Sequence, residues 1–265
     1  MIIKRLTIAL AAIVLSGAAA GAQTIAEPAP DLRARISVGT DIKIVKGFHL
    51  EIDEQLRLKD NMSSVDRLYT TAGLSYKFND YVKAGAGYVS IMDWKPNKKE
   101  WEFKHRFFAE VTGTYRAGLW TFSLREKFQL TNIGDHNEYE NPSNKMALKS
   151  RFQVKYRGFR VPIRPYALFE ARVALNDSRL SATYNPSEGG YTSFSLLGYD
   201  DAHFNRYRAG IGADWKISKR SEFNLYYYFD YVTDKEIDVK GTELRSLVYT
   251  RDLNNILGVG YTFSF

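Results

Sequence analysis

Along most of this chain, apolar residues occupy every second position. The final segment shows the pattern, because Val259, Tyr261, Phe263 and Phe265 alternate with glycine, threonine and serine. Successive side chains of a β-strand point to opposite faces, so a segment of this kind has one apolar face and one polar face. An apolar outer wall around a polar interior is typical of a transmembrane β-barrel.

The alternation predicts eleven strands separated by turns and loops. The predicted strands are residues 34–44, 48–58, 66–78, 81–92, 101–116, 119–131, 146–157, 161–175, 204–217, 221–232 and 252–265. Longer polar loops alternate with tight turns at residues 45–47, 79–80, 117–118, 158–159 and 218–220. This arrangement predicts a transmembrane antiparallel barrel over residues 34–265, with about 10–12 strands, short periplasmic turns and longer extracellular loops.

The odd number of predicted strands is a difficulty, because single-chain bacterial barrels have an even number and keep both ends in the periplasm. With eleven strands, the first strand descends from the extracellular side. Three interpretations remain open. Residues 24–33 rise along or through the lumen, or they form a strand with Pro28 and Pro30 at its margin. Alternatively, a further crossing lies within residues 176–203 or 238–250.

Residues 1–22 have the features of a signal peptide. Lys4 and Arg5 form a basic start, an apolar run follows over residues 6–15, and residues 20–22 form a small-residue cleavage site. Cleavage leaves residues 23–33 as an N-terminal segment and lowers the formal net charge from +7 to +5. No later apolar stretch is long enough for a spanning helix. The predicted location is therefore the outer membrane of a Gram-negative cell, after Sec-dependent export.

The apolar faces of the predicted strands carry no lysine or arginine. A cationic side chain at the bilayer midplane costs about 2–4 kcal/mol, so contact with outer-membrane lipid explains their absence. Amphipathic rings favour the interface between lipid and water. The predicted aromatic girdle comprises Trp101, Tyr115, Trp120, Tyr156, Trp215 and Phe223. A soluble sandwich or lipocalin-like barrel is the alternative, but so many aromatic residues on one face of eleven long strands would overfill its interior.

The opposite faces of the predicted strands concentrate charge, with more cations than anions. The predicted basic wall of the lumen comprises Arg125, Lys127, Lys149, Arg151, Lys155, Arg157, Arg164, Arg172, Arg206 and Arg208, and the predicted lumen acids are Glu51, Asp53, Glu110, Glu170 and Asp214. Two interpretations remain open. The charged side chains interlock and fill a narrow barrel, or the excess of cations favours small anionic solutes in a pore.

Several short motifs are more specific than strand alternation. They are residues 65–77 with Asp66-Arg67-Leu68-Tyr69, residues 84–88, His105-Arg106-Phe107, residues 123–128 and residues 256–261. On these motifs the mature chain resembles an outer-membrane barrel family of Bacteroidetes, domain of unknown function 2490. The resemblance implies a barrel but no activity. The ending at Tyr261, Phe263 and Phe265 is similar to the C-terminal aromatic signal of outer-membrane proteins, which implies the assembly machinery as a partner.

An outer-membrane hydrolase of lipase or protease type is a further alternative. Among the four histidines, only His105 falls on an apolar face, where Glu126 is another polar residue. If Arg116 pairs with Leu119 across their turn, His105 lies four residues from the position opposite Glu126. That offset is about 13 Å, which is too far for a catalytic hydrogen bond. The register of Ser150 on the next strand is open.

The predicted loop over residues 176–203 contains a second candidate site. Ser195, Asp200, Asp201 and His203 occur there at a loose spacing that is common by chance. A loop of this composition more readily contacts other molecules or covers the mouth of the barrel. The chain has no cysteine, which excludes disulfides and thiolate metal sites. We therefore expect no enzymatic activity, metal or cofactor, and basic residues that line a lumen disfavour nucleic-acid binding.

Overall fold

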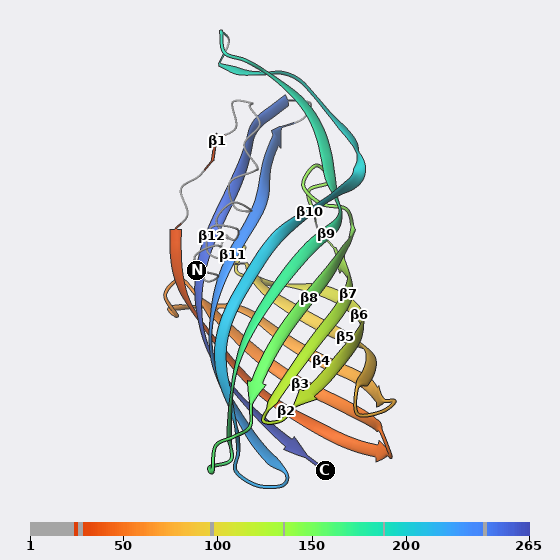
Figure 1. The fold of residues 1–265 in the computed structure, drawn as a ribbon. Helices are drawn as coiled ribbons and strands as arrows, with labels where there is room; N and C mark the ends of the chain where they lie inside the picture. Colours follow the sequence, from red (N-terminus) through yellow and green to blue (C-terminus); the bar gives the residue numbers. More distant parts are fainter. Residues whose placement is uncertain (1–23, 26–28, 96–97, 135, 188, 241–242) are drawn as a thin grey trace, which may run out of the picture.

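The computed structural model describes residues 24–25, 29–95, 98–134, 136–187, 189–240 and 243–265. Within this part of the chain, eleven strands, β2 to β12, form one closed sheet in sequence order (Figure 1). Each strand pairs antiparallel with the next, and β12 pairs parallel with β2. The predicted all-β barrel is confirmed. No helix in the described ranges is long and apolar enough to cross a membrane.

The strands follow the predicted segments closely in the first half of the chain and are longer in the second half. Their bounds are β1 (Thr24–Ile25), β2 (Ala29–Val45), β3 (Phe48–Lys59), β4 (Ser64–Lys77), β5 (Val82–Lys95), β6 (Glu100–Ala117), β7 (Trp120–Ile133), β8 (Asn144–Tyr156), β9 (Ile163–Asn185), β10 (Gly190–Lys216), β11 (Ser221–Lys240) and β12 (Glu243–Ser264). Every predicted segment overlaps one of β2–β12. Alternation locates the strands because a shift of the register by one residue would turn the apolar side chains of a strand toward the polar interior.

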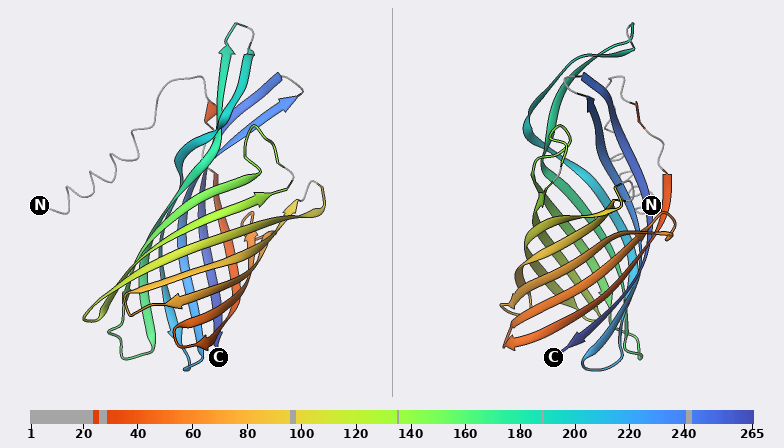
Figure 2. Two further views of the ribbon diagram at one scale, coloured as in Figure 1. Left: turned by 90° about the vertical axis from the view of Figure 1, so that its right-hand side faces the viewer. Right: turned by 180° about the vertical axis from the view of Figure 1, so that it is seen from behind.

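Two predicted loops are instead continuations of strands. Residues 176–203 belong almost entirely to β9 and β10, which remain paired as far as Asn185 and Gly190. β11 and β12 remain paired as far as Lys240 and Glu243. Figure 2 shows both hairpins projecting beyond the barrel wall. The predicted loop over 176–203 is therefore wrong, as is a hidden crossing in either stretch. Both hairpins nevertheless contain apolar pairs or buried apolar residues: Leu180 pairs with Leu196 in β9–β10, and Ile237 and Leu244 are buried in β11–β12.

The parallel pairing of β2 with β12 explains the odd number of strands. The pairs run in register from Ala29–Asp252 to Asp41–Ser264. Ten antiparallel steps separate β2 from β12, so these two strands necessarily point the same way and only a parallel ladder closes the ring. β2 begins at Ala29 rather than at residue 34, with Pro30 near its start, where the missing N–H is tolerated. Of the three interpretations, a strand with Pro30 at its margin is the one observed for residues 29–33.

The two ends of the barrel differ. We call one the short-turn end, where residues 46–47, 78–81, 118–119, 157–162 and 217–220 connect the strands and where β12 ends. The opposite, long-loop end carries the hairpins and the start of β2. Gly47 and Gly118 have φ angles of 83° and 57°, which suit the tight reversals at the short-turn end. The predicted alternation of short turns and long loops holds only at the β7–β8 connection, because the other connections at the long-loop end are as short as these turns. The projecting hairpins distinguish the two ends instead.

The parallel closure predicts a specific cross-link in this cysteine-free chain. Ala34 and Leu257 are directly paired, and neighbouring strands lie about 4.8 Å apart, within the range of a disulfide. We expect the double variant Ala34→Cys, Leu257→Cys to form an intramolecular disulfide under mild oxidation of the folded protein, detected by electrophoretic mobility with and without reductant. In the control Ala34→Cys, Phe263→Cys, the second cysteine pairs with Thr40. Equal cross-linking of both variants would contradict the closure.

Candidate functional site in the barrel lumen

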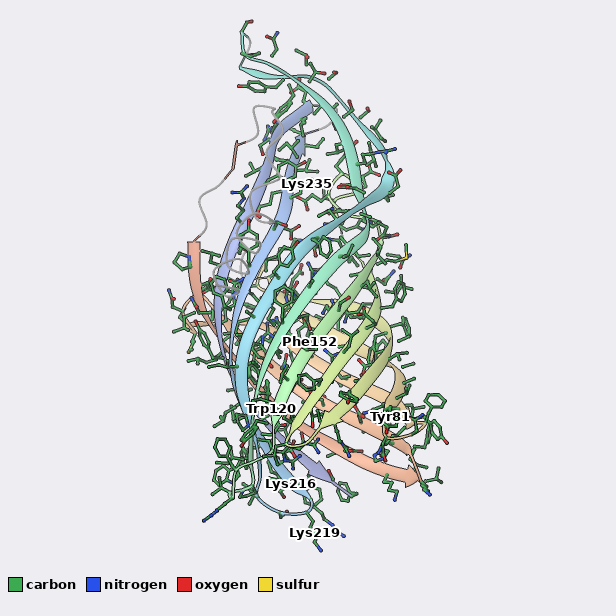
Figure 3. All side chains as sticks on the ribbon, in the orientation of Figure 1. Tyr81, Trp120, Phe152, Lys216, Lys219 and Lys235 are labelled. Carbon is green, nitrogen blue, oxygen red and sulfur yellow. The ribbon has the colours of Figure 1, made fainter. Side chains whose placement is uncertain are left out.

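The outer wall of the barrel is apolar. Phe107 on β6, Leu124 on β7 and Ile211 on β10 lie within paired strands, yet they are 56%, 51% and 63% exposed. Phe152, on the part of the wall that faces the viewer in Figure 3, is also exposed. The apolar set of each strand therefore faces outward, and the polar set faces the interior.

Polar side chains on the outer wall bond a neighbour on the adjacent strand. The pairs, joined at 2.5–2.9 Å, are Thr70–Glu54, Ser150–Glu126, Tyr88–His105 and Tyr227–Asn255. The outward position of Glu54 was not predicted, although the alternation of leucine and isoleucine along β3 indicates it. Without these bonds, the polar groups would be surrounded by apolar side chains on the outer wall.

The predicted girdle residues lie at both ends of the barrel. Trp101 is at the start of β6, at the long-loop end, where its ring lies 5.2 Å from that of Trp94. The residues near the short-turn end are Tyr115, Trp120, Tyr156, Trp215 and Phe223. The rings of Trp120 and Tyr156 are 4.8 Å apart. The aromatic residues thus form a band near the short turns, and Trp101 belongs to a separate group at the other end.

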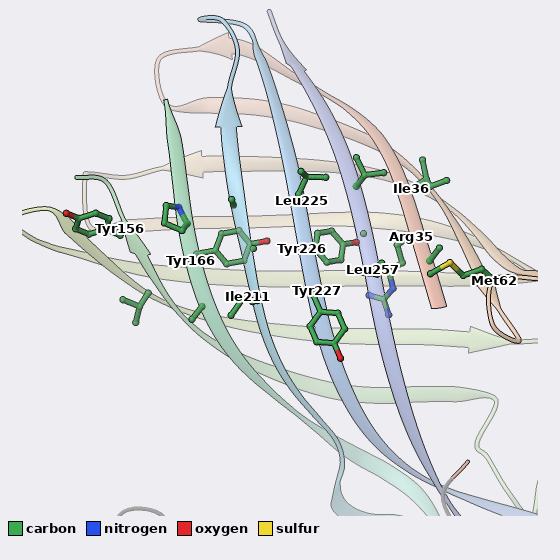
Figure 4. Close-up of a pocket in the computed structure, with 18 of the residues that line it drawn as sticks. Arg35, Ile36, Met62, Tyr156, Tyr166, Ile211, Leu225, Tyr226, Tyr227 and Leu257 are labelled. Carbon is green, nitrogen blue, oxygen red and sulfur yellow. The ribbon is translucent and has the colours of Figure 1, made fainter. Parts of the chain in front are cut away.

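A broad hollow of about 1030 Å³ lies on the outer wall over β9–β12 and β2. Its lining includes Ile36, Ile211, Leu225 and Leu257 (Figure 4). The lining is mostly hydrocarbon, so this surface suits contact with apolar chains and offers few groups for chemistry. The charged side chains gather on the other side of the wall.

Inside the barrel, a cavity of about 370 Å³ is lined by eight cations and two carboxylates. The cations are Arg35, Arg57, Arg106, Arg125, Lys127, Lys149, Arg151 and Arg208, and the carboxylates are Asp53 and Glu170. Of the other predicted basic residues, Lys155 and Arg157 line a second cavity of about 300 Å³ near the short turns. Arg164 lies 3.8 Å from Glu222. The first cavity is therefore strongly positive.

Glu170 of β9 is the centre of the charge network. Its side chain is almost fully buried, and its Oε2 accepts from both Nε and Nη2 of Arg151, with N···O distances of 2.8 and 2.7 Å. Arg206 lies 3.1 Å away, and Arg125 and Arg208 each lie 3.7 Å away. One carboxylate therefore serves four guanidinium groups. A single negative charge cannot neutralise all of them, so the excess positive charge stays in the lumen.

The other carboxylates of the lumen are largely committed to nearby cations. The pairs are Asp230 with Arg208, Asp214 with Lys155, Glu110 with Lys127 and Glu51 with Lys83. The contact of Asp230 with Arg208 is bidentate, at 2.5 and 2.6 Å. Asp53 lines the cavity, and no cation of the described residues lies within 4 Å of it. The acids therefore do not balance the wall.

The strand register brings four cations into one row across β7–β10. Lys127 pairs with Lys149, Lys149 with Arg172, and Arg172 with Arg206. We call these four residues the cationic row. Like charges at directly opposite positions destabilise a sheet. Among the described residues, Lys127 at the β7 end of the row is the one member with a nearby carboxylate that no other member shares, Glu110 at 3.0 Å, which also lies 4.0 Å from Arg125.

The remaining members of the cationic row have weak or shared partners. Among the described residues, Lys149 has no hydrogen bond and no carboxylate within 4 Å. Arg172 donates to the neutral Asn205 side chain at 2.7 Å. Arg206 shares Glu170 with three other arginines, and its Nε is buried without a partner. Three adjacent cations thus lack a neutralising group of their own.

Glycines on the inner wall make room for tyrosine rings. A Cβ at Gly210 would lie 2.2 Å from the ring of Tyr228, and one at Gly258 would lie 1.9 Å from the ring of Tyr226. Glycine at these positions lets the rings lie flat against the neighbouring strand. Arg208 is placed over the Tyr228 ring at 5.1 Å, in range of a cation–π contact. The tyrosines therefore help to fix the arginines that line the cavity.

The connection between β7 and β8 reaches across the long-loop end. Glu140 accepts a hydrogen bond from the backbone N–H of Ile237 on β11 at 2.9 Å. The Ser178 hydroxyl of β9 donates to the carbonyl of Tyr139 at 2.5 Å. Lys235, at the level of the hairpins in Figure 3, bonds the carbonyl of Ser178. These contacts tie the connection to both projecting hairpins and narrow this end of the lumen.

His105 and Glu126 are not brought together. The predicted register across the β6–β7 turn is wrong, because Ala117 pairs with Trp120 and leaves a two-residue turn. Glu126 therefore lies opposite Val111, six residues along β6 from His105. The neighbours of these two residues, Tyr88 and Ser150, are on different strands. Each outward polar group is satisfied locally, with no shared catalytic geometry.

The second histidine candidate lies at the base of the β9–β10 hairpin. His203 is 3.3 Å from Asp201 and 3.7 Å from Asp177. Ser195 lies opposite Ser181, further out in the same hairpin. Asp200 lies 3.1 Å from Arg179. The four predicted residues thus do not converge on one point. In the described ranges, no group of three or more histidine, aspartate or glutamate side chains is placed to hold a metal ion.

The sequence matches a known protein family. The model of a family described as "Protein of unknown function (DUF2490)" matches residues 36–240, which is most of the chain. The chain belongs to the DUF2490 family. The match runs from β2 to the end of β11 and includes every member of the cationic row. A search of the curated proteins finds none that matches this sequence.

The unequal pairing of lumen cations predicts opposite effects of one substitution at two sites on β8. Lys149→Met removes a charge whose two cross-strand neighbours, Lys127 and Arg172, are also cations, so we expect the free energy of unfolding to rise by about 1 kcal/mol. Lys155→Met leaves Asp214 without its cation, so we expect a loss of about 2 kcal/mol. Urea unfolding in detergent, in chloride buffer, measures both. A change of the same sign in the free energy of unfolding of both variants would contradict the charge assignment.

Proposed function

We propose that this protein is an integral outer-membrane β-barrel without enzymatic activity, and that its lumen admits small anionic solutes. The membrane part of the proposal rests on the exposed apolar wall, which would be unstable in water. The bands of aromatic residues near the strand ends suit the two interfaces of a bilayer. The proposed signal peptide, residues 1–22, lies outside the described residues.

The orientation follows from the two ends of the barrel. Bacterial barrels keep short turns in the periplasm and longer connections outside, so the projecting hairpins face the exterior in this proposal. The end of β12, with Tyr261, Phe263 and Phe265, then lies on the periplasmic side. Phe265 is 66% exposed, so it is accessible to a recognition partner. We propose that the outer-membrane assembly machinery recognises this ending.

Two adjacent residues of β2 test which face meets lipid. Ile36 is outward and has apolar neighbours in Leu56 and Val259, whereas Ser37 lines the lumen cavity near Asp53. We expect Ile36→Lys to destabilise the protein in vesicles, lowering its free energy of unfolding by about 2–4 kcal/mol. Ser37→Lys should cost little, because Asp53 offers it a partner. Urea-dependent unfolding in vesicles measures both, and an equal cost would refute lipid contact at Ile36.

The anion proposal rests on one observation, which is the imbalance of eight cations against two carboxylates around the lumen cavity. A wall that only fills the barrel needs its charges paired, because unpaired buried charge costs several kcal/mol per ion. An excess of cations inside a low-dielectric wall raises the local concentration of anions. The connection between β7 and β8 narrows the long-loop end, so we propose a narrow path suited to small solutes.

Planar-bilayer recordings test this proposal. In a KCl gradient, we expect the refolded protein to give a reversal potential that shows higher permeability to chloride than to potassium. Arg106→Gln, inside the cavity, should lower the permeability ratio, whereas Lys219→Gln in an exposed short turn should leave it unchanged. A bilayer that stays sealed with the inserted protein would refute conduction, and cation selectivity would refute the role of the basic wall.

A further inference from the structure

The cationic row has a composition and setting that call for an anionic partner. Lys149, Arg172 and Arg206 are consecutive cross-strand neighbours with no neutralising carboxylate of their own. Arg206 keeps a buried Nε without a hydrogen-bond partner. Leaving donors of this kind unpaired costs free energy that no contact among the described residues returns. A bound anion would supply the missing acceptors.

β6, the strand next to the row, contributes a further cation. Arg106 of β6 lines the same cavity as Lys149, and its Nε donates to the neutral hydroxyl of Thr131 at 2.8 Å. Arg106 is among the groups that interact electrostatically with both Lys149 and Arg172. Glu170, the acid that interacts with Lys149, already accepts through one oxygen from both Nε and Nη2 of Arg151. Lys149 and Arg106 therefore face one space of about 370 Å³. Arg172 and Arg206 continue the row from Lys149 along the wall beside it.

The side chains indicate the chemical class of the ligand. Arginine presents a planar fork of donors that matches the oxygens of phosphate or carboxylate, and lysine adds a point charge. Several cations without compensating acids favour a multiply charged anion over chloride. The cavity is large enough for a tetrahedral oxyanion with a substituent attached.

We propose that Lys149, Arg172 and Arg206, with Arg106 of the neighbouring strand β6, form a binding site for phosphate or a phosphate monoester inside the barrel. The site deepens the proposed function, because it gives the lumen a preferred anion. Binding also follows from the local charge alone and does not require conduction. A sealed barrel could hold phosphate, and an anion-selective pore could lack this site.

Equilibrium dialysis of radiolabelled inorganic phosphate against the detergent-folded protein, in phosphate-free buffer, tests the site. We expect saturable binding that Lys149→Met or Arg106→Gln weakens by roughly tenfold or more, since each substitution removes a charged donor. Lys149→Arg should keep most of the affinity. Lys219→Met, which removes the same charge from an exposed turn, should bind as the unaltered protein does.

A second measurement guards against variants that misfold. Phosphate should raise the urea midpoint of the unaltered protein and of Lys219→Met more than chloride does at equal ionic strength, and it should raise that of Lys149→Met much less. Equal phosphate affinity of Lys149→Met and Lys219→Met would overturn the proposal. Equal stabilisation by chloride and phosphate would overturn it as well. Bilayer conductance is measured in a separate experiment, so the phosphate site and anion conduction can each fail without the other.

Discussion

The structure depends on the closure of a single sheet in which every strand alternates between two environments. Because the ring has no free edge, all strands share one inside and one outside, and a side chain's parity along its strand decides which it meets. The apolar set of β6, β7 and β10 is exposed on the outer wall, while Glu170 and Arg208 are buried inside. The same constraint forces β2 and β12 to pair in parallel, because the strands are odd in number.

Closure also concentrates charge in a way that no single strand shows. Neighbouring strands place Lys127, Lys149, Arg172 and Arg206 in one row, although the four residues are spread over eighty positions of the chain. Acids elsewhere in the lumen pair with the cations beside them. The row is left with weak partners, and this local imbalance, rather than the net charge of the protein, supports the proposed preference for anions.

The two ends of the barrel have different roles in this arrangement. Short turns and the aromatic band define one end, where β12 finishes with Phe263 and Phe265 in ring contact. At the other end the hairpins of β9–β10 and β11–β12 extend well past the wall, and the connection between β7 and β8 bonds to both. The hairpins therefore brace a segment across the mouth as well as presenting surface to the surroundings.

The sequence by itself predicted the barrel, a range of 10–12 strands and the face on which most charged residues lie, because a period of two is a local property of the chain. It also placed Glu170 and Arg206 on the inner face. Only the tertiary structure decided the partners. The register across β7–β10 aligned the cationic row, the β6–β7 turn moved Glu126 opposite Val111, and residues 176–203 stayed paired as a hairpin beyond the barrel wall. Register and closure depend on contacts between distant segments, which alternation along one strand does not encode.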